Sequence, residues 1–135
     1  MKMIIQIFLC LILFVNMSFA NTNLPSYNDS KQVINISENQ DTFTIVLDSN
    51  PTTGYSWNVS SYNKNYIELL EHHYVATKPK LIGSGGKEYW TFKALPKAFK
   101  KNRTLKLALL YARPWDLNDQ SRKIIFNLNI IKSSQ

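Results

Sequence analysis

Apolar and polar residues alternate along most of the chain after Lys31. The alternation has a period of two, which is typical of a β-strand that buries one face and leaves the other in water. Six stretches show this pattern: 33–36, 43–47, 55–59, 89–93, 105–111 and 124–130. Each stretch has an apolar face and a more polar one, as expected for antiparallel sheets that are solvated on one side. The pattern therefore predicts strands over most of the chain.

One further stretch, NKNYIELLEHHYVAT at 63–77, has a less regular pattern. Ile67, Leu69 and Leu70 also satisfy a helical period. Because no long helix is convincing and Pro and Gly punctuate the chain, we interpret the stretch as two short strands or as one strand with a bulge. About seven or eight strands in a chain of this length favour an all-β fold, an immunoglobulin-like antiparallel β-sandwich without the cysteine pair of antibody domains.

The first twenty residues have the composition of a leader. Lys2 precedes an apolar run at 4–15, and Ser18 and Ala20 give the small-x-small ending of a secretory signal peptide. The run is shorter than the ~20 residues that a membrane-spanning helix needs, so an uncleaved anchor is the weaker interpretation. We expect a signal peptide at 1–20, a flexible lead-in at 21–30 and one domain at 31–135. The product would be secreted, or would reside in a periplasm or a vesicular lumen.

Cysteine and charge narrow the classes of function. Cleavage of the leader removes Cys10, the only cysteine, which excludes disulfides, thiolate zinc sites and a cysteine nucleophile from the mature domain. The formal charge of +7 becomes +6 when Lys2 is subtracted. Its small clusters, at Lys78 and Lys80 and at 97–103, are typical of a solvated surface rather than of a nucleic-acid or membrane patch. We therefore expect a monomer that binds no nucleic acid and associates with no membrane stably.

The connection NPTTGY, from Asn50 to Tyr55, holds more than a turn requires. Pro51 fixes its own φ and Gly54 can supply a positive φ, which is enough to reverse the chain. Thr52 and Thr53 have few rotamers and can present methyl and hydroxyl groups to a partner at low entropic cost. The alternative is a plain turn with polar filler. We expect Tyr55 to anchor the base of this loop.

The connection LIGSGG contains Gly83, Ser84, Gly85 and Gly86. Glycine-rich loops bind phosphate where a helix follows, but the following KEYWTFKAL predicts a strand, so a nucleotide site is not indicated. Two interpretations stay open. The glycines form a flexible hairpin tip, or they allow the backbone to approach another molecule closely.

The connection YARPWD contains Arg113, Pro114 and Trp115. A Trp beside an Arg, stiffened by Pro, has the composition of an interface hot spot. The alternative is that Trp115 folds back to cap the core. In an immunoglobulin-like sandwich, NPTTGY, GSGG and RPW would be the B–C, D–E and F–G loops at one end of the sheets. They would then form one surface with threonine at its crest.

The three motifs, in this order, resemble those of the chagasin-type inhibitors of papain-like cysteine peptidases. The hallmarks of that family are NPTTGY, a GxGG loop and an RPW-type loop, which stand here at 50–55, 83–86 and 113–115. The similarity in layout covers roughly residues 31 to 131. The stretches at 60–79 and 95–103 are less diagnostic.

The resemblance implies a reversible competitive inhibitor that occupies the active-site cleft of papain-like enzymes, including cathepsin L-like ones. By that analogy Thr52 and Thr53 would lie over the catalytic cysteine and histidine of the enzyme without being cleaved. The loop at 83–86 would line the non-primed side of the cleft through backbone contacts. Arg113 and Trp115 would pack on the primed side.

Other candidate residues carry less. His72 and His73 are adjacent, so on a strand they would face opposite sides and could not share one metal ion. Ser84 has no nucleophile elbow around it. We therefore expect no metal, no cofactor and no catalysis, although an enzyme stays open as the weakest hypothesis.

A stronger alternative is an immunoglobulin-like adhesion or recognition module that binds another protein or a glycan. Glycosylation sequons begin at four asparagines: Asn28, Asn35, Asn58 and Asn102.

Overall fold

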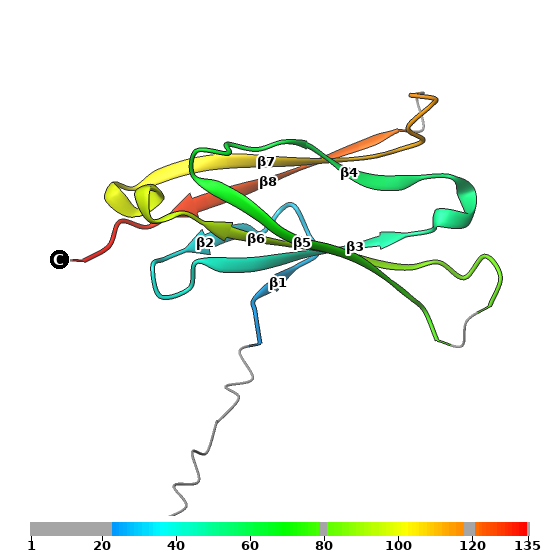
Figure 1. Cartoon of the computed structure of the whole chain (residues 1–135), viewed down its shortest axis with the longest axis horizontal. Helices are drawn as coiled ribbons and strands as arrows, with labels where there is room; N and C mark the ends of the chain where they lie inside the picture. Colours follow the sequence, from blue (N-terminus) through cyan, green and yellow to red (C-terminus); the bar gives the residue numbers. More distant parts are fainter. Residues whose placement is uncertain (1–22, 79–80, 118–120, 135) are drawn as a thin grey trace, which may run out of the picture.

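The protein folds into two β-sheets that pack face to face (Figure 1). The computed structural model describes residues 23–78, 81–117 and 121–134, so the signal peptide expected at 1–20 lies outside the described residues. One sheet has the strand order β1-β3-β6-β5 and the other has the order β2-β8-β7-β4. The elements of the described ranges are, in chain order, β1 (Ser26–Tyr27), β2 (Val33–Ile36), β3 (Thr42–Ser49), the 3-10 helix η1 (Pro51–Thr53), β4 (Ser56–Ser61), β5 (Ile67–Ala76), β6 (Gly86–Ala94), the 3-10 helix η2 (Pro96–Lys100), β7 (Arg103–Ala112) and β8 (Arg122–Ile130).

The core lies between the two sheets because their apolar faces point toward each other. In β3, the side chains of Phe43, Ile45 and Leu47 are buried, and in β7 those of Leu107 and Leu109 are buried. Full burial of one such side chain stabilises the fold by about 1.5–3 kcal/mol. The period of two in the sequence arises because alternate side chains of each strand point into this core. The predicted all-β sandwich is confirmed.

Within the ambiguous stretch at 63–77, residues Ile67–Ala76 form a single strand, β5, which pairs with β6. The pairing register shifts between Leu69 and Glu71, so the interpretation as one strand with a bulge is confirmed. β5 is the last strand of its sheet, and Ile67 is its one buried residue. Because most residues of β5 are exposed, its sequence does not show a clean alternation.

The two short N-terminal strands make both sheets mixed. β1 pairs parallel with β3, and β2 pairs parallel with β8, whereas the other six strands pair antiparallel as expected. β1 lies within 21–30, where the sequence predicts a lead-in without structure. The N–H of Thr44 also donates a hydrogen bond of 2.9 Å to the carbonyl of Pro25. A strand of two residues is too short to produce a periodic pattern, so only the structure reveals it.

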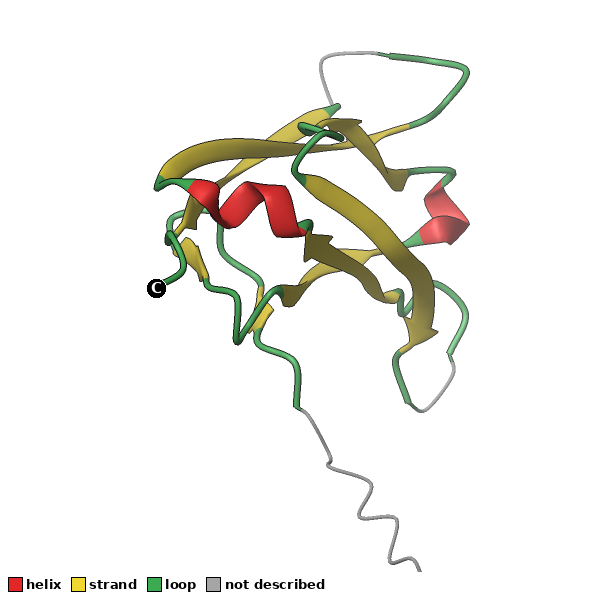
Figure 2. Ribbon diagram, turned by 60° about the vertical axis from the view of Figure 1, so that its left-hand side comes forward, coloured by secondary structure: helices red, strands yellow, loops and turns green. Residues whose placement is uncertain are grey.

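Three connections lie together at one end of the sandwich, which we call the loop end: β3–β4 with η1, β5–β6 and β7–β8 (Figure 1). The helix η2 lies at the opposite end (Figure 2). These three connections carry the NPTTGY, GSGG and RPW motifs. Within the described ranges, no helix is long and apolar enough to cross a membrane.

Candidate functional site

The NPTTGY loop is a short helical turn with an open crest. Pro51 occupies the first turn of η1, and Gly54 ends it in the left-handed region at φ 80°. The N–H of Gly54 donates to the carbonyl of Pro51 at 3.0 Å, which closes the turn. Thr52 and Thr53 are exposed at the top. We call these two residues the crest.

Asn50 holds the loop to its surroundings. Its Oδ1 accepts a hydrogen bond of 2.6 Å from the hydroxyl of Thr52, and its Nδ2 donates one of 3.1 Å to the carbonyl of Gly83. Its backbone N–H donates to the hydroxyl of Tyr111 on β7, also at 3.1 Å. A carboxylate could not donate to Gly83, and a shorter side chain would not reach both partners. This role of the asparagine could not be predicted from the sequence, because Gly83 and Tyr111 lie far from it along the chain.

Arg113 supports the crest from the other side. Its Nε and Nη2 donate to the carbonyl of Thr53 at 3.1 and 3.0 Å. Its guanidinium also lies over the ring of Tyr55, 4.8 Å from the centroid. Tyr55 is buried and stacks on Tyr111, in agreement with a role at the base of the loop. Arg113 is half-buried, and it directs two nitrogen donors to the one carbonyl of Thr53.

Trp115 is presented to solvent. A tight turn closes from the N–H of Asp116 to the carbonyl of Arg113 at 3.1 Å, with Pro114 inside it. The indole is 75% exposed, so it does not cap the core. It leans on Gly54, where an added Cβ would lie 3.2 Å from two ring carbons. The exposed ring therefore flanks the crest.

The glycines of the GSGG loop have different neighbours. Gly83 has a φ of 79° and open space around its Cα, whereas a Cβ on Gly85, at φ 68°, would lie 2.8 Å from the carbonyl oxygen of Ser49. A Cβ on Gly86 would overlap the carbonyl oxygen of Val75. Packing within the domain therefore requires glycine at positions 85 and 86, because a side chain there would clash with backbone atoms. Of the three glycines, Gly83 alone has room for an approaching molecule.

Exposed apolar side chains that the sequence patterns did not single out surround the same end. Leu81 is 66% exposed, Ile82 is fully exposed and Leu117 is 70% exposed. Leu81 and Ile82 line a groove of about 380 Å³ beside Pro51 and Thr52. An apolar pair directly before a glycine cluster was the available signal in the sequence.

We expect Gly85→Ala to lower the free energy of unfolding by about 1–2 kcal/mol, since it adds both positive-φ strain and a contact with Ser49. Gly83→Ala is the matched control because it has the same φ strain without the contact. Urea denaturation of both variants measures the difference. Equal losses in the two variants would show that the contact with Ser49 costs nothing.

The histidines lie on opposite faces of β5. His72 stacks on Trp90 with 3.6 Å between ring centroids, and His73 stacks on Tyr89 at 4.9 Å. In the part of the chain that the structure describes, no three histidine, cysteine or acidic residues gather as metal ligands would.

Comparison with known proteins places the chain in a family. The family model described as "Chagasin family peptidase inhibitor I42" matches residues 37–130. Amoebiasin-1 of Entamoeba histolytica is 32% identical over 88 residues, which are 64% of this chain and 78% of that protein. The crystal structure of the cysteine protease inhibitor EhICP2 from Entamoeba histolytica superposes with a TM-score of 0.54 at 23% identity, over 73% of this chain and 95% of that one. PbICP-C, in its complex with falcipain-2, gives a TM-score of 0.55 at 16% identity over 81% and 90%. At 23% and 16% identity, the two solved structures show only that the fold is shared. Membership of the family is shown by the family model and by the similarity to Amoebiasin-1. The chain therefore belongs to the chagasin family of peptidase inhibitors.

Proposed function

We propose that this protein is a reversible competitive inhibitor of papain-like cysteine peptidases that plugs the active-site cleft with its three loops. One observation supports the proposal most directly: the glycine loop and Trp115 both contact residues that flank the crest. Asn50 donates to the carbonyl of Gly83, and Trp115 packs against Gly54. EhICP2 is described as a cysteine protease inhibitor, and PbICP-C was solved in complex with falcipain-2, which supports the same class of target.

The internal hydrogen bonds give the loop a shape before any enzyme arrives. The carbonyl of Asn50 accepts from the N–H of Thr53 at 3.1 Å and from its hydroxyl at 2.7 Å. Pro51, which lies between Asn50 and Thr53, has a φ angle fixed by its ring and further restricts the backbone of the loop. A loop that is already ordered loses little conformational entropy on binding, which favours tight association.

Hydrogen bonds to the carbonyl groups of the loop would also oppose its cleavage by the enzyme. The carbonyl groups of Asn50, Pro51 and Thr53 all accept hydrogen bonds within the domain. A nucleophile needs one carbonyl in a near-attack geometry, and a substrate reaches it by adjusting freely in the cleft. Here the adjustment would break bonds inside the inhibitor. The crest can therefore occupy the catalytic centre as a poor substrate.

The location and the oligomeric state of the protein are also part of the proposal. We assign the inhibitor to a secreted, periplasmic or vesicular location because residues 1–20 read as a signal peptide. It would act as a monomer, since all three loops come from one chain. A generic adhesion module would need no threonine crest, so the inhibitor is the favoured function.

The test is a titration of papain and a cathepsin L-like enzyme with the protein lacking residues 1–20. We expect the rate of hydrolysis of a fluorogenic peptide to fall with inhibitor concentration, and the apparent inhibition constant to rise linearly with substrate concentration. Mass spectrometry should recover the inhibitor intact. An absence of inhibition at micromolar protein across several such enzymes would contradict the function, and an inhibition constant independent of substrate would contradict binding in the cleft.

A further inference from the structure

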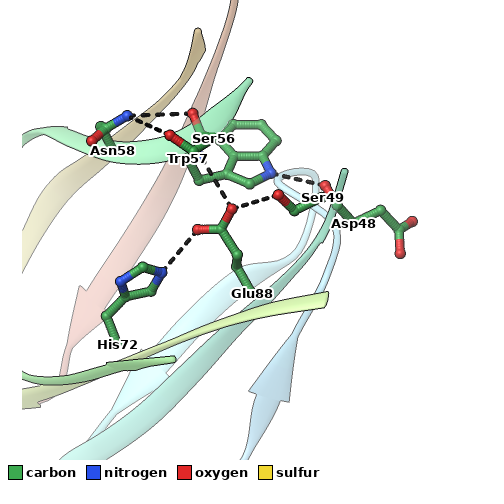
Figure 3. Close-up of polar contacts among 7 residues, drawn as sticks. All are labelled: Asp48, Ser49, Ser56, Trp57, Asn58, His72 and Glu88. Atoms are coloured by element: carbon green, nitrogen blue, oxygen red, sulfur yellow. Dashed lines mark hydrogen bonds and ion pairs between the residues drawn. The ribbon is translucent and has the colours of Figure 1, made fainter. Parts of the chain in front are cut away.

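A buried carboxylate lies directly beneath the NPTTGY loop. Glu88 of β6 is 3% exposed, and its carboxylate has three partners (Figure 3). Its Oε1 accepts from the hydroxyl of Ser49 at 2.5 Å and from the backbone N–H of Trp57 at 3.2 Å, and its Oε2 lies 2.8 Å from Nε2 of His72. Because an ionised carboxylate only accepts, Nε2 of His72 carries the hydrogen.

The two donors to Oε1 lie on either side of the loop. Ser49 is the last residue of β3, and Trp57 is the second residue of β4. These strands belong to different sheets, so no ladder of backbone hydrogen bonds joins them. The loop therefore bridges the two sheets, and its span depends on side-chain ties.

A second tie joins the same two flanks. The indole N–H of Trp57 donates to the carbonyl of Asp48 at 2.9 Å, parallel to the link through Glu88 (Figure 3). Burying a carboxylate is costly unless it is fully hydrogen-bonded. Here two of its three hydrogen-bond partners, Ser49 and Trp57, flank the same loop. Two of the donors that the buried carboxylate needs are thus supplied by the two ends of the loop, which it holds close to each other.

We propose that Glu88 is a positioning residue for inhibition: it fixes the separation of the loop's two ends so that the crest keeps its binding shape. The inference rests on the proposed function, and it adds to it a buried residue that lies outside all three loops. His72 completes the arrangement by satisfying Oε2, and its ring is held by stacking on Trp90.

The conservative variant separates positioning from charge. In Glu88→Gln, the amide oxygen can still accept from Ser49 and Trp57, and the amide NH2 can donate to His72 once the histidine adopts its other tautomer. We expect an inhibition constant within about threefold of the original protein, with the tautomer change visible in the 15N shifts of the His72 ring. In Glu88→Leu the hydrogen bonds from Ser49 and from the backbone N–H of Trp57 are lost, while the bond from the Trp57 indole to Asp48 remains. We expect the inhibition constant to rise about tenfold or more.

Thr91→Val is the matched control. Thr91 lies on the same strand with similar burial, and its hydroxyl bonds to that of Thr44 at 3.0 Å, away from the loop. Its removal should lower stability and leave inhibition unchanged. Amide hydrogen exchange at Thr53 and Gly54, whose N–H groups close the loop, should accelerate in Glu88→Leu and not in Thr91→Val. If Glu88→Leu does not fold, Ser49→Ala removes one donor and should show the same changes to a lesser degree.

The outcomes distinguish the two proposals. If the unaltered protein inhibits, an unchanged inhibition constant in Glu88→Leu overturns the inference, as does an equal loss in Thr91→Val or in Glu88→Gln. If the unaltered protein does not inhibit, the proposed function fails, and hydrogen exchange alone decides whether Glu88 orders the loop. Unaltered exchange in Glu88→Leu then overturns the inference as well.

Discussion

Replacing Trp115 with alanine is expected to weaken inhibition about thirtyfold, which corresponds to about 2 kcal/mol of binding free energy. The indole is 75% exposed, and a tight turn through Pro114 holds it beside the crest. A large aromatic side chain that is already ordered buries much apolar area on binding at small entropic cost. Inhibition constants for the unaltered protein and for Trp115→Ala against papain measure the change.

Ile131→Ala provides the control for Trp115→Ala. Ile131 is also apolar and exposed, at 45%, but it follows β8 at the end of the sandwich opposite the loops. Its truncation should leave the inhibition constant as it was. Thermal melts of both variants should stay close to that of the unaltered protein. A melting temperature that falls in Trp115→Ala as far as in a core deletion would assign the residue a structural role instead.

The fold was predictable where a strand buries one face. β8 shows this best, because the buried Phe126, Leu128 and Ile130 alternate with the partly exposed Asn127 and Asn129. β5 was ambiguous for the complementary reason, since an edge strand with one buried residue places little constraint on its sequence. The length of a segment also sets a limit. β1 spans two residues, and its pairing with β3 depends on contacts that no local pattern encodes.

The site was predictable only in its outline. Pro51 and Gly54 are local signals of a turn, and their roles follow from backbone geometry. The partners of Asn50 and Gly85 come from distant parts of the chain, so the sequence could not reveal why those residue types are needed. Glu88 is the extreme case. In the sequence it is one charged residue in a strand, and only folding brings the two flanks of the loop onto its carboxylate.

Gly86→Ala is expected to destabilise the fold by about 3 kcal/mol, more than Gly85→Ala. Gly86 lies in β6 between Ser49 of β3 and Ala76 of β5. An added Cβ would overlap the carbonyl oxygen of Val75, and it would come within 2.7 Å of the hydroxyl of Tyr74. Because the first of these neighbours is backbone, the clash is relieved only if β5 moves away from β6.

The consequence should extend from stability to inhibition. The β5–β6 connection carries Gly83, whose carbonyl accepts the hydrogen bond from Asn50, so a displaced β5 would withdraw support from the crest. Urea denaturation gives the loss of stability, and inhibition measured well below the transition gives the effect on the folded fraction. Lys87→Ala, one residue along β6, removes an exposed ion pair with Asp48 and should leave the unfolding midpoint nearly unchanged. A Gly86→Ala protein as stable as Lys87→Ala would mean that β5 yields freely at this point. The glycine would then be needed for neither the sheet nor the loop above it.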